Sequence, residues 1–207
     1  MNRILPILSA GLLLASCNAG GGSSSRADEL VHPEWSRNAV IYEMNVRQHS
    51  ADGTLISARA DLPRLHQLGI DIVWLMPVHP IGEVNRKGGE NEDHGLVQPG
   101  STSLGSPYSV QDYKALNPDY GTWEDFDAFV STAHEYDMKV IIDWVAGHTA
   151  FDAVWTTDSI GMGYYLLDSL GGLQPPRGTD WFDVAHLDWD NGETNGLYDA
   201  MEDAMAS

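Results

Sequence analysis

Apolar residues gather in three short runs along the chain, and each run is bounded by polar residues. The runs cover residues 39–44, 70–76 and 140–144. A short, nearly continuous apolar run predicts a strand that is buried on both faces, as in a parallel sheet. The pattern therefore predicts buried parallel strands that are separated by long stretches of chain.

A first helix is predicted over residues 61–68, where leucines recur at helical spacing. The leucines expected on one helical face are Leu62, Leu65 and Leu68. Proline is tolerated in the first turn of a helix, and glycine is a good residue with which to end one. Pro63 and Gly69 therefore predict a short helix that begins close to Pro63 and stops at Gly69.

Two further helices are predicted nearer to the carboxyl terminus. Thr122 and Asp125 have the spacing of a capping box, in which two side chains satisfy free backbone N–H groups at a helix start. Apolar residues then follow at helical spacing: Phe126, Phe129, Val130 and Ala133. The same spacing begins a later helix at Leu197, Met201 and Met205.

The alternation of strand and helix predicts an α/β fold in which helices wrap a parallel sheet. We interpret residues 31–207 as about the first three strand–helix units of a TIM (β/α)8 barrel, which needs roughly 250 residues. Long loops follow strand 2 (residues 77–121) and strand 3 (residues 144–193). Both leave the carboxyl ends of strands, where barrel enzymes carry their active sites. An open three-stranded domain is the alternative.

The amino terminus has the pattern of a bacterial export signal. A basic start at Arg3 is followed by apolar residues 4–14, and residues 1–16 form the predicted signal peptide. The ending Leu-Ala-Ser-Cys resembles a lipoprotein box, which implies that Cys17 is lipidated and that residues 17–30 form a flexible tether. The alternative is an ordinary signal peptide with a chance cysteine. Cys17 is the single cysteine, so neither a disulfide nor thiol catalysis is expected.

Charge and composition narrow the class of protein. The apolar fraction of 43% suffices for a core, and no apolar run approaches the length of a membrane-spanning helix. The formal net charge of −19 would repel nucleic acid and anionic membrane surfaces. We expect an exported, membrane-anchored lipoprotein, on the periplasmic face or the cell surface, that contacts the membrane through its lipid only.

Candidate chemistry follows the third predicted strand, which ends in Asp143, with His148 five residues later. Alone, such residues are more often a capping carboxylate and a loop histidine. About thirty residues upstream stands a segment with Tyr108, Asp112 and Tyr113. In this order and spacing, the segments resemble the catalytic domain of the alpha-amylase family, glycoside hydrolase family 13. The resemblance covers nearly all of residues 31–207.

The resemblance implies roles for three residues. Tyr108 would stack under a sugar, because an aromatic face fits the apolar C–H face of a pyranose. His148 would donate to a hydroxyl of the sugar in the cleaved subsite, and Asp143 would support the hydrogen-bond network beneath the nucleophile. Tyr113 is expected to be structural. Gly105 stands where exo-acting members often carry Asp, which favours an internal-cleaving or broad-specificity amylase-type enzyme over an alpha-1,6- or sucrose-directed one.

The function that the resemblance implies is hydrolysis of α-glucosidic bonds in starch or maltooligosaccharides by a retaining mechanism. The nucleophile and the acid/base residue are expected beyond Ser207, so no catalytic carboxylate is assigned here and these residues alone are expected to be inactive. The alternatives are a transglycosidase or debranching member of the family, or a non-catalytic glycan-binding lipoprotein.

No cofactor or metal is expected. The family's calcium site uses an Asn and an Asp, and these positions are Gly147 and His186 in this sequence, which are poor calcium ligands. The acidic run at residues 90–94 is more typical of a solvated loop than of a metal cluster. The tryptophans near the second long loop could pack that loop or support sugars: Trp144, Trp155, Trp181 and Trp189.

Overall fold

The computed structural model describes residues 32–87 and 103–207. The chain divides into two units, residues 1–37 and 38–207, and a short 3-10 helix, η1 (Glu34–Asn38), spans the boundary between them in sequence. The predicted signal peptide, Cys17 with its tether, and the acidic run at 90–94 lie outside the described residues. Among the helices that are described, none combines the length and apolar character that crossing a bilayer requires.

A parallel sheet of three strands organises the second unit. The strands are β1 (Ile41–Met44), β2 (Ile72–Leu75) and β3 (Lys139–Ile142), in the order β1–β2–β3. Their last residues lie in register: Met44, Leu75 and Ile142. The predicted strands and the α/β class are therefore confirmed, and the carboxyl ends of all three strands meet at one edge of the sheet.

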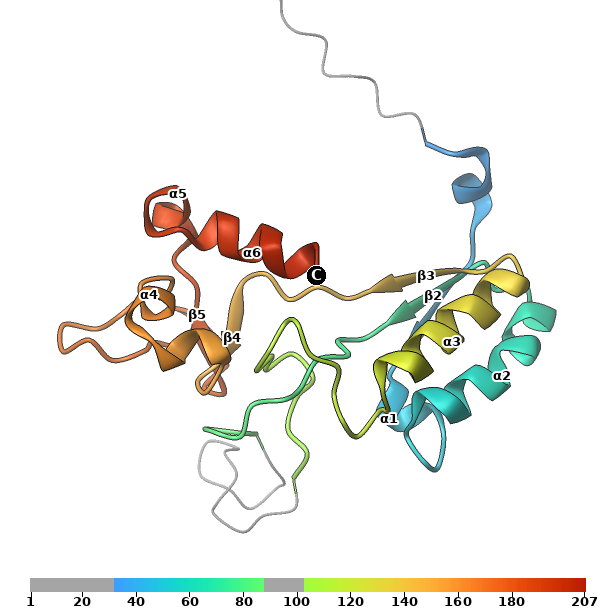
Figure 1. The fold of residues 1–207 in the computed structure, drawn as a ribbon, viewed down its shortest axis with the longest axis horizontal. Helices are drawn as coiled ribbons and strands as arrows, with labels where there is room; N and C mark the ends of the chain where they lie inside the picture. Colours follow the sequence, from blue (N-terminus) through green and yellow to red (C-terminus); the bar gives the residue numbers. More distant parts are fainter. Residues whose placement is uncertain (1–31, 88–102) are drawn as a thin grey trace, which may run out of the picture. The chain divides into compact units, whose positions relative to one another are not determined.

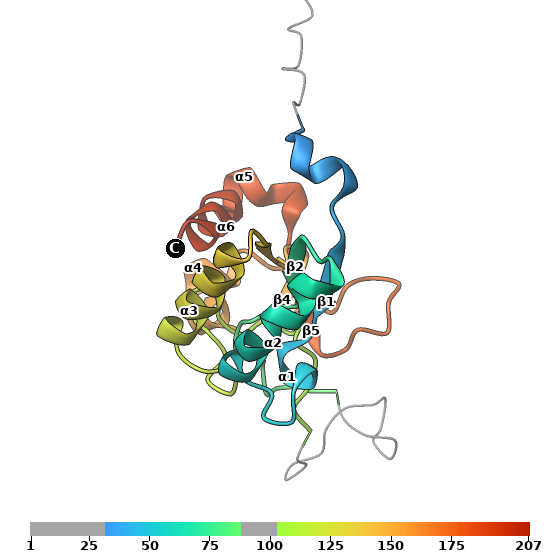
Figure 2. The same cartoon turned by 90° about the vertical axis from the view of Figure 1, so that its right-hand side faces the viewer.

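Two helices, α2 (Leu55–Leu68) and α3 (Trp123–Glu135), lie side by side over one face of this sheet (Figures 1 and 2). A single turn, α1 (Val46–His49), precedes α2. The core between sheet and helices is built from fully buried side chains, which include Met44, Leu62, Leu65, Val73, Leu75, Phe129 and Ala133. Burial of this apolar surface is the main stabilising contribution, at about 25 cal/mol per Å² removed from water.

The predicted start of the first helix was wrong. α2 begins at Leu55, and the Thr54 hydroxyl caps it by accepting a hydrogen bond from the backbone N–H of Ser57. Pro63 therefore lies inside the helix, where it removes one backbone hydrogen bond. The additional turns bury Leu55 and Ala58 completely, which extends the apolar stripe toward the sheet and offsets that loss.

The end of the same helix was predicted in part. Gly69 takes the left-handed conformation (φ 88°), and its N–H bonds the carbonyls of the last turn, as expected of a terminating glycine. Leu68, however, is 65% exposed and does not share the buried face of Leu62 and Leu65. Leu68 is the last helical residue, at the end of the apolar stripe, so its side chain reaches solvent.

The capping box at the start of α3 was predicted correctly. The Thr122 hydroxyl accepts a hydrogen bond from the Asp125 N–H at 3.3 Å, and the Asp125 carboxylate accepts one from the Thr122 N–H at 2.9 Å. This reciprocal pair satisfies two donors that a helix start would otherwise leave free. Phe129 and Ala133 then point into the core, with Phe126 and Val130 packed beside them.

The connection after β3 is folded into short elements rather than an irregular loop. β4 (His148–Ala150) and β5 (Val184–His186) form an antiparallel pair in which His148 lies opposite His186. The remaining elements are η3 (Val154–Thr157), α4 (Ser159–Met162), η4 (Trp189–Asn191), α5 (Gly192–Asn195) and α6 (Leu197–Met205). They enclose a second apolar cluster, which includes Val110, Tyr113, Val145, Ala185, Leu187, Leu197 and Met201.

Candidate functional site

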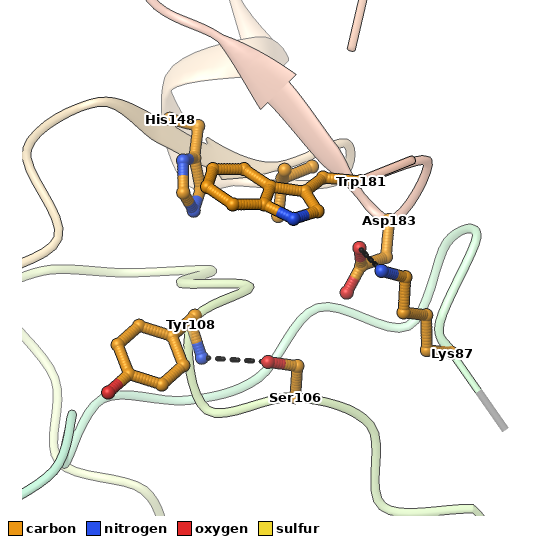
Figure 3. A pocket seen from close by; sticks show the side chains of 7 residues that line it. Lys87, Ser106, Tyr108, His148, Trp181 and Asp183 are labelled. Carbon is orange, nitrogen blue, oxygen red and sulfur yellow. Dashed lines mark hydrogen bonds and ion pairs between the residues drawn. The ribbon is translucent and has the colours of Figure 1, made fainter. Parts of the chain in front are cut away.

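A pocket of about 350 Å³ lies where the two long connections meet. The connection after β2 contributes part of its wall, β4 contributes His148, and β5 with the residues just before it contributes the rest (Figure 3). The lining residues are Lys87, Ser106, Tyr108, His148, Trp181, Asp183 and Val184. A concave site of this size, largely apolar with a few polar groups, is typical of a small-ligand site.

Tyr108 and Asp143 are joined by a hydrogen bond. The Tyr108 hydroxyl donates to Oδ2 of Asp143 across 3.0 Å. Asp143 directly follows β3, and its backbone N–H donates to the Leu75 carbonyl at 2.8 Å, so the sheet edge fixes the carboxylate. Burial, together with the hydrogen bond to Asp143, raises the pKa of Tyr108 to about 12. The hydroxyl therefore stays protonated at neutral pH and holds its ring against the sheet edge.

His148 is the first residue of β4, and its ring lines the same pocket as Tyr108. The imidazole meets the indole of Trp181 nearly edge to face, with ring centroids 5.7 Å apart. Burial lowers the pKa of His148, and a hydrogen bond to the Tyr108 backbone and the nearby Asp183 carboxylate oppose this shift only in part. The ring is therefore neutral near pH 7, with one nitrogen that donates and one that accepts a hydrogen bond.

Tyr113 is buried in the second apolar cluster and does not line the pocket, but it holds the backbone next to it. Its hydroxyl lies 2.6 Å from the Val145 carbonyl oxygen and 3.0 Å from that of His148, so its proton can bond either carbonyl. Burial raises the pKa of Tyr113, which keeps that proton in place. Tyr113 therefore fixes the backbone that leads from Asp143 to His148.

The structure brings Tyr108 and His148 together in the pocket, and Asp143 reaches the site through Tyr108. Sequence reasoning missed an ion pair in the same wall, where Lys87 Nζ lies 3.6 Å from Oδ1 of the buried Asp183. No local pattern could have paired these residues, because they belong to different connections. Charged residues are rarely buried without a partner, so the burial of Asp183 could not be predicted without knowing that Lys87 lies beside it.

The tryptophans that the sequence left undecided separate into two groups. Trp144, Trp155 and Trp189 pack against the second apolar cluster. The indole N–H of Trp144 contacts the Met201 sulfur at 3.2 Å, and that of Trp189 donates to the Ala146 carbonyl at 2.8 Å. Trp181 differs, because it is 46% exposed and lines the pocket.

The two positions that the resemblance implies for calcium, Gly147 and His186, do not offer the ligands that calcium prefers. Gly147 has no side chain, and its carbonyl already accepts a hydrogen bond from the Leu187 N–H at 3.2 Å. His186 offers a buried imidazole nitrogen, Nδ1, without a hydrogen-bond partner, whereas calcium prefers oxygen ligands. Within residues 32–87 and 103–207, no group of three or more His, Cys, Asp or Glu side chains could hold a metal ion.

Comparisons with known proteins identify the family and agree with the fold. The chain matches the family "Alpha amylase, catalytic domain" over residues 31–204. It is similar to the structure of an alpha-amylase from Lactobacillus plantarum, with 41% identity, a TM-score of 0.69, and coverage of 82% of this chain and 35% of that one. It also resembles a noncanonic maltogenic alpha-amylase from Thermotoga neapolitana, with 34% identity, a TM-score of 0.67, and coverage of 82% and 36%.

Among curated proteins, an alpha-1,4-glucan:maltose-1-phosphate maltosyltransferase from Mycolicibacterium smegmatis is 33% identical over 187 residues, which are 81% of this chain and 26% of that protein. The protein of the same name from Salinibacter ruber is 36% identical over 133 residues, or 58% of this chain and 20% of the relative. The chain thus spans about a quarter or less of these relatives and about a third of the matched structures.

Fold and site together define an α/β protein whose three-stranded parallel sheet and surrounding helices match amylase structures. The chain belongs to the alpha-amylase family, glycoside hydrolase family 13, whose members include hydrolases and transglycosidases. The resemblance that the sequence motifs predicted is therefore confirmed for the family.

Proposed function

We propose that residues 31–207 form the first three strand–helix units of an amylase-type barrel that cleaves α-glucosidic bonds in starch or maltooligosaccharides. The observation that carries the proposal is the convergence of Tyr108, Asp143 and His148 at the carboxyl edge of the sheet. In barrel enzymes this edge carries the active site. The similarity to alpha-amylases over most of the chain supports the substrate class.

The residues of this chain would bind and orient one glucose unit. The Tyr108 ring offers an aromatic face to the sugar, and Asp143 holds that ring through its 3.0 Å hydrogen bond. The neutral imidazole of His148 bonds the Tyr108 backbone carbonyl through its N–H, and its other nitrogen can accept a hydrogen bond from a sugar hydroxyl. That hydroxyl becomes a stronger donor as positive charge develops at the anomeric carbon, so the bond would strengthen in the transition state. The two carboxyl groups that a retaining glycosidase requires are not assigned to any residue here.

Transfer to a glucan instead of water is the second candidate, and the similarity to two maltosyltransferases favours it. Both reactions would share the pocket described above, because both pass through a glycosyl-enzyme when configuration is retained. They differ in the acceptor that resolves this intermediate. The acceptor, rather than the glucose-binding wall, would decide between hydrolase and transferase.

The test uses an active protein that carries these residues, supplied with maltoheptaose alone or with maltose 1-phosphate and a glucan. A retaining hydrolase should release reducing ends in the α configuration, which NMR can detect. Phosphate release that depends on the glucan would identify the transferase. Products of inverted configuration would contradict the proposal, and binding of glucan without turnover would support a glycan-binding lipoprotein instead. Residues 1–207 alone are expected to release no reducing ends.

We also propose that the protein is exported and anchored through Cys17. The support is the sequence alone, since a basic start and an apolar stretch lead directly to the single cysteine. Cells that are fed a fatty-acid analogue should label the wild-type protein, and Cys17→Ala should abolish the label. A matched Ser16→Ala variant should still be labelled. Persistent labelling of Cys17→Ala would exclude this anchor.

A further inference from the structure

Trp181 lies across the pocket from Tyr108, and the two rings come from different connections (Figure 3). We propose that Trp181 is a second sugar platform, which positions a neutral pyranose between its indole and Tyr108 and beside His148. This inference rests on the proposed function, because it assumes that the pocket takes a glucan.

Trp181 is not packed into either of the two apolar clusters of the protein. The other tryptophans of this region belong to the second apolar cluster, whereas Trp181 lies outside it and keeps 46% of its surface exposed. Its indole N–H has no hydrogen-bond partner among the described residues, while those of Trp144 and Trp189 each have one. A large aromatic side chain that is left open at the wall of a pocket is available to cover an incoming ligand.

The backbone around Trp181 is held in place. The Trp181 N–H donates to the Thr179 hydroxyl at 3.3 Å, and that hydroxyl donates to the Pro176 carbonyl at 2.8 Å. Two residues later the carbonyl of Asp183 accepts a hydrogen bond from the Ser109 hydroxyl at 3.0 Å, beside Tyr108 in the chain. The platform and Tyr108 are therefore tied to each other before any sugar arrives, which lowers the entropic cost of binding.

The chemistry of the wall selects a neutral sugar. Aromatic rings on two sides suit the apolar faces of a pyranose, and the ends of its hydroxyl groups can meet the polar side chains of Lys87, Ser106 and Asp183. The ammonium group of Lys87 is compensated by the Asp183 carboxylate 3.6 Å away, so the pocket offers no free positive charge for an anionic sugar. A glucose unit of a maltooligosaccharide has apolar ring faces and carries no charge, so it fits this wall.

The platform can be tested by binding, without any turnover. The protein carries a net charge of −19 and therefore migrates in native gels. Gels that contain increasing concentrations of soluble starch slow a protein that binds it, and the loss of mobility gives the dissociation constant. Trp181→Ala should weaken binding roughly tenfold, and Trp181→Phe should restore most of it, because the phenyl ring keeps an aromatic face. The matched control is Trp123→Ala, because Trp123 is 45% exposed on α3 but does not line the pocket.

A second measurement does not depend on how Trp181→Ala folds. In ¹⁵N-labelled wild-type protein, the indole signal that Trp181→Phe removes should shift on addition of maltotetraose, while the Trp123 signal should not. Starch binding that is equal in wild type and Trp181→Ala, with an unmoved Trp181 signal, would overturn the platform alone. A wild-type protein that neither slows in starch nor responds to maltotetraose would overturn the platform and the proposed function together.

Discussion

Replacement of His148 with alanine is expected to lower kcat/KM on maltooligosaccharides roughly ten- to hundredfold, since a buried sugar hydroxyl that loses its hydrogen-bond partner costs about 1–3 kcal/mol. The effect should fall mainly on kcat. The imidazole lines the pocket, and its bond to a sugar hydroxyl would be stronger in the transition state than in the ground state. Steady-state kinetics of an active protein that carries these residues measures this difference.

Two controls separate a loss of chemistry from a loss of structure. His134→Ala alters an exposed histidine in the last turn of α3, so its rate should equal that of the wild type. Because burial lowers the pKa of His148, the ring is neutral at pH 7 and above, and the rate deficit of His148→Ala should not vary with pH there. Full activity in a folded His148→Ala protein would mean that His148 has no role in catalysis, and it would weaken the role proposed for Tyr108.

Gly161→Ala is expected to lower the free energy of unfolding by about 3 kcal/mol, which is the upper end of what overpacking usually costs. A Cβ on this residue of α4 would meet the Trp155 carbonyl oxygen at 1.9 Å and its carbonyl carbon at 2.7 Å. Both atoms belong to the backbone and cannot rotate away. Alanine is favoured over glycine by about 1 kcal/mol in a helix, so the steric overlap decides the sign.

The matched control for this change is Gly147→Ala. A Cβ at Gly147 would have nothing within 4 Å, so the free energy of unfolding should change by no more than about 0.5 kcal/mol. Chemical unfolding of the two variants beside the wild type provides the comparison. Equal stability of Gly161→Ala and the wild type would mean that the turn from Trp155 to α4 can yield, contrary to its close packing.

Local signals predicted the regular elements of this protein well. The capping box of Thr122 and Asp125 and the terminating Gly69 needed no tertiary information, because their hydrogen bonds join residues within one turn. The start of α2 was missed because Pro63 outweighed the leucine stripe that continues back to Leu55. That choice depends on the sheet against which the extra turns are buried.

The short strands β4 and β5 could not be predicted, because three residues are too few to show a period. Each strand is stabilised by its partner, which lies far away in sequence. The same reason hides the ion pair of Lys87 and Asp183, since neither residue is unusual until the other stands beside it.

The sequence by itself determined the parallel strands, the main helices and the family, because these depend on apolar periodicity and on motifs whose residues are close together. Order and spacing also singled out Tyr108, Asp143 and His148. Only the tertiary structure decided that Tyr108 bonds Asp143 and that Trp181, unlike Trp144, Trp155 and Trp189, faces the pocket. It also decided that Lys87 forms an ion pair with Asp183. Those outcomes depend on how two long connections pack against each other, and no local pattern records that contact.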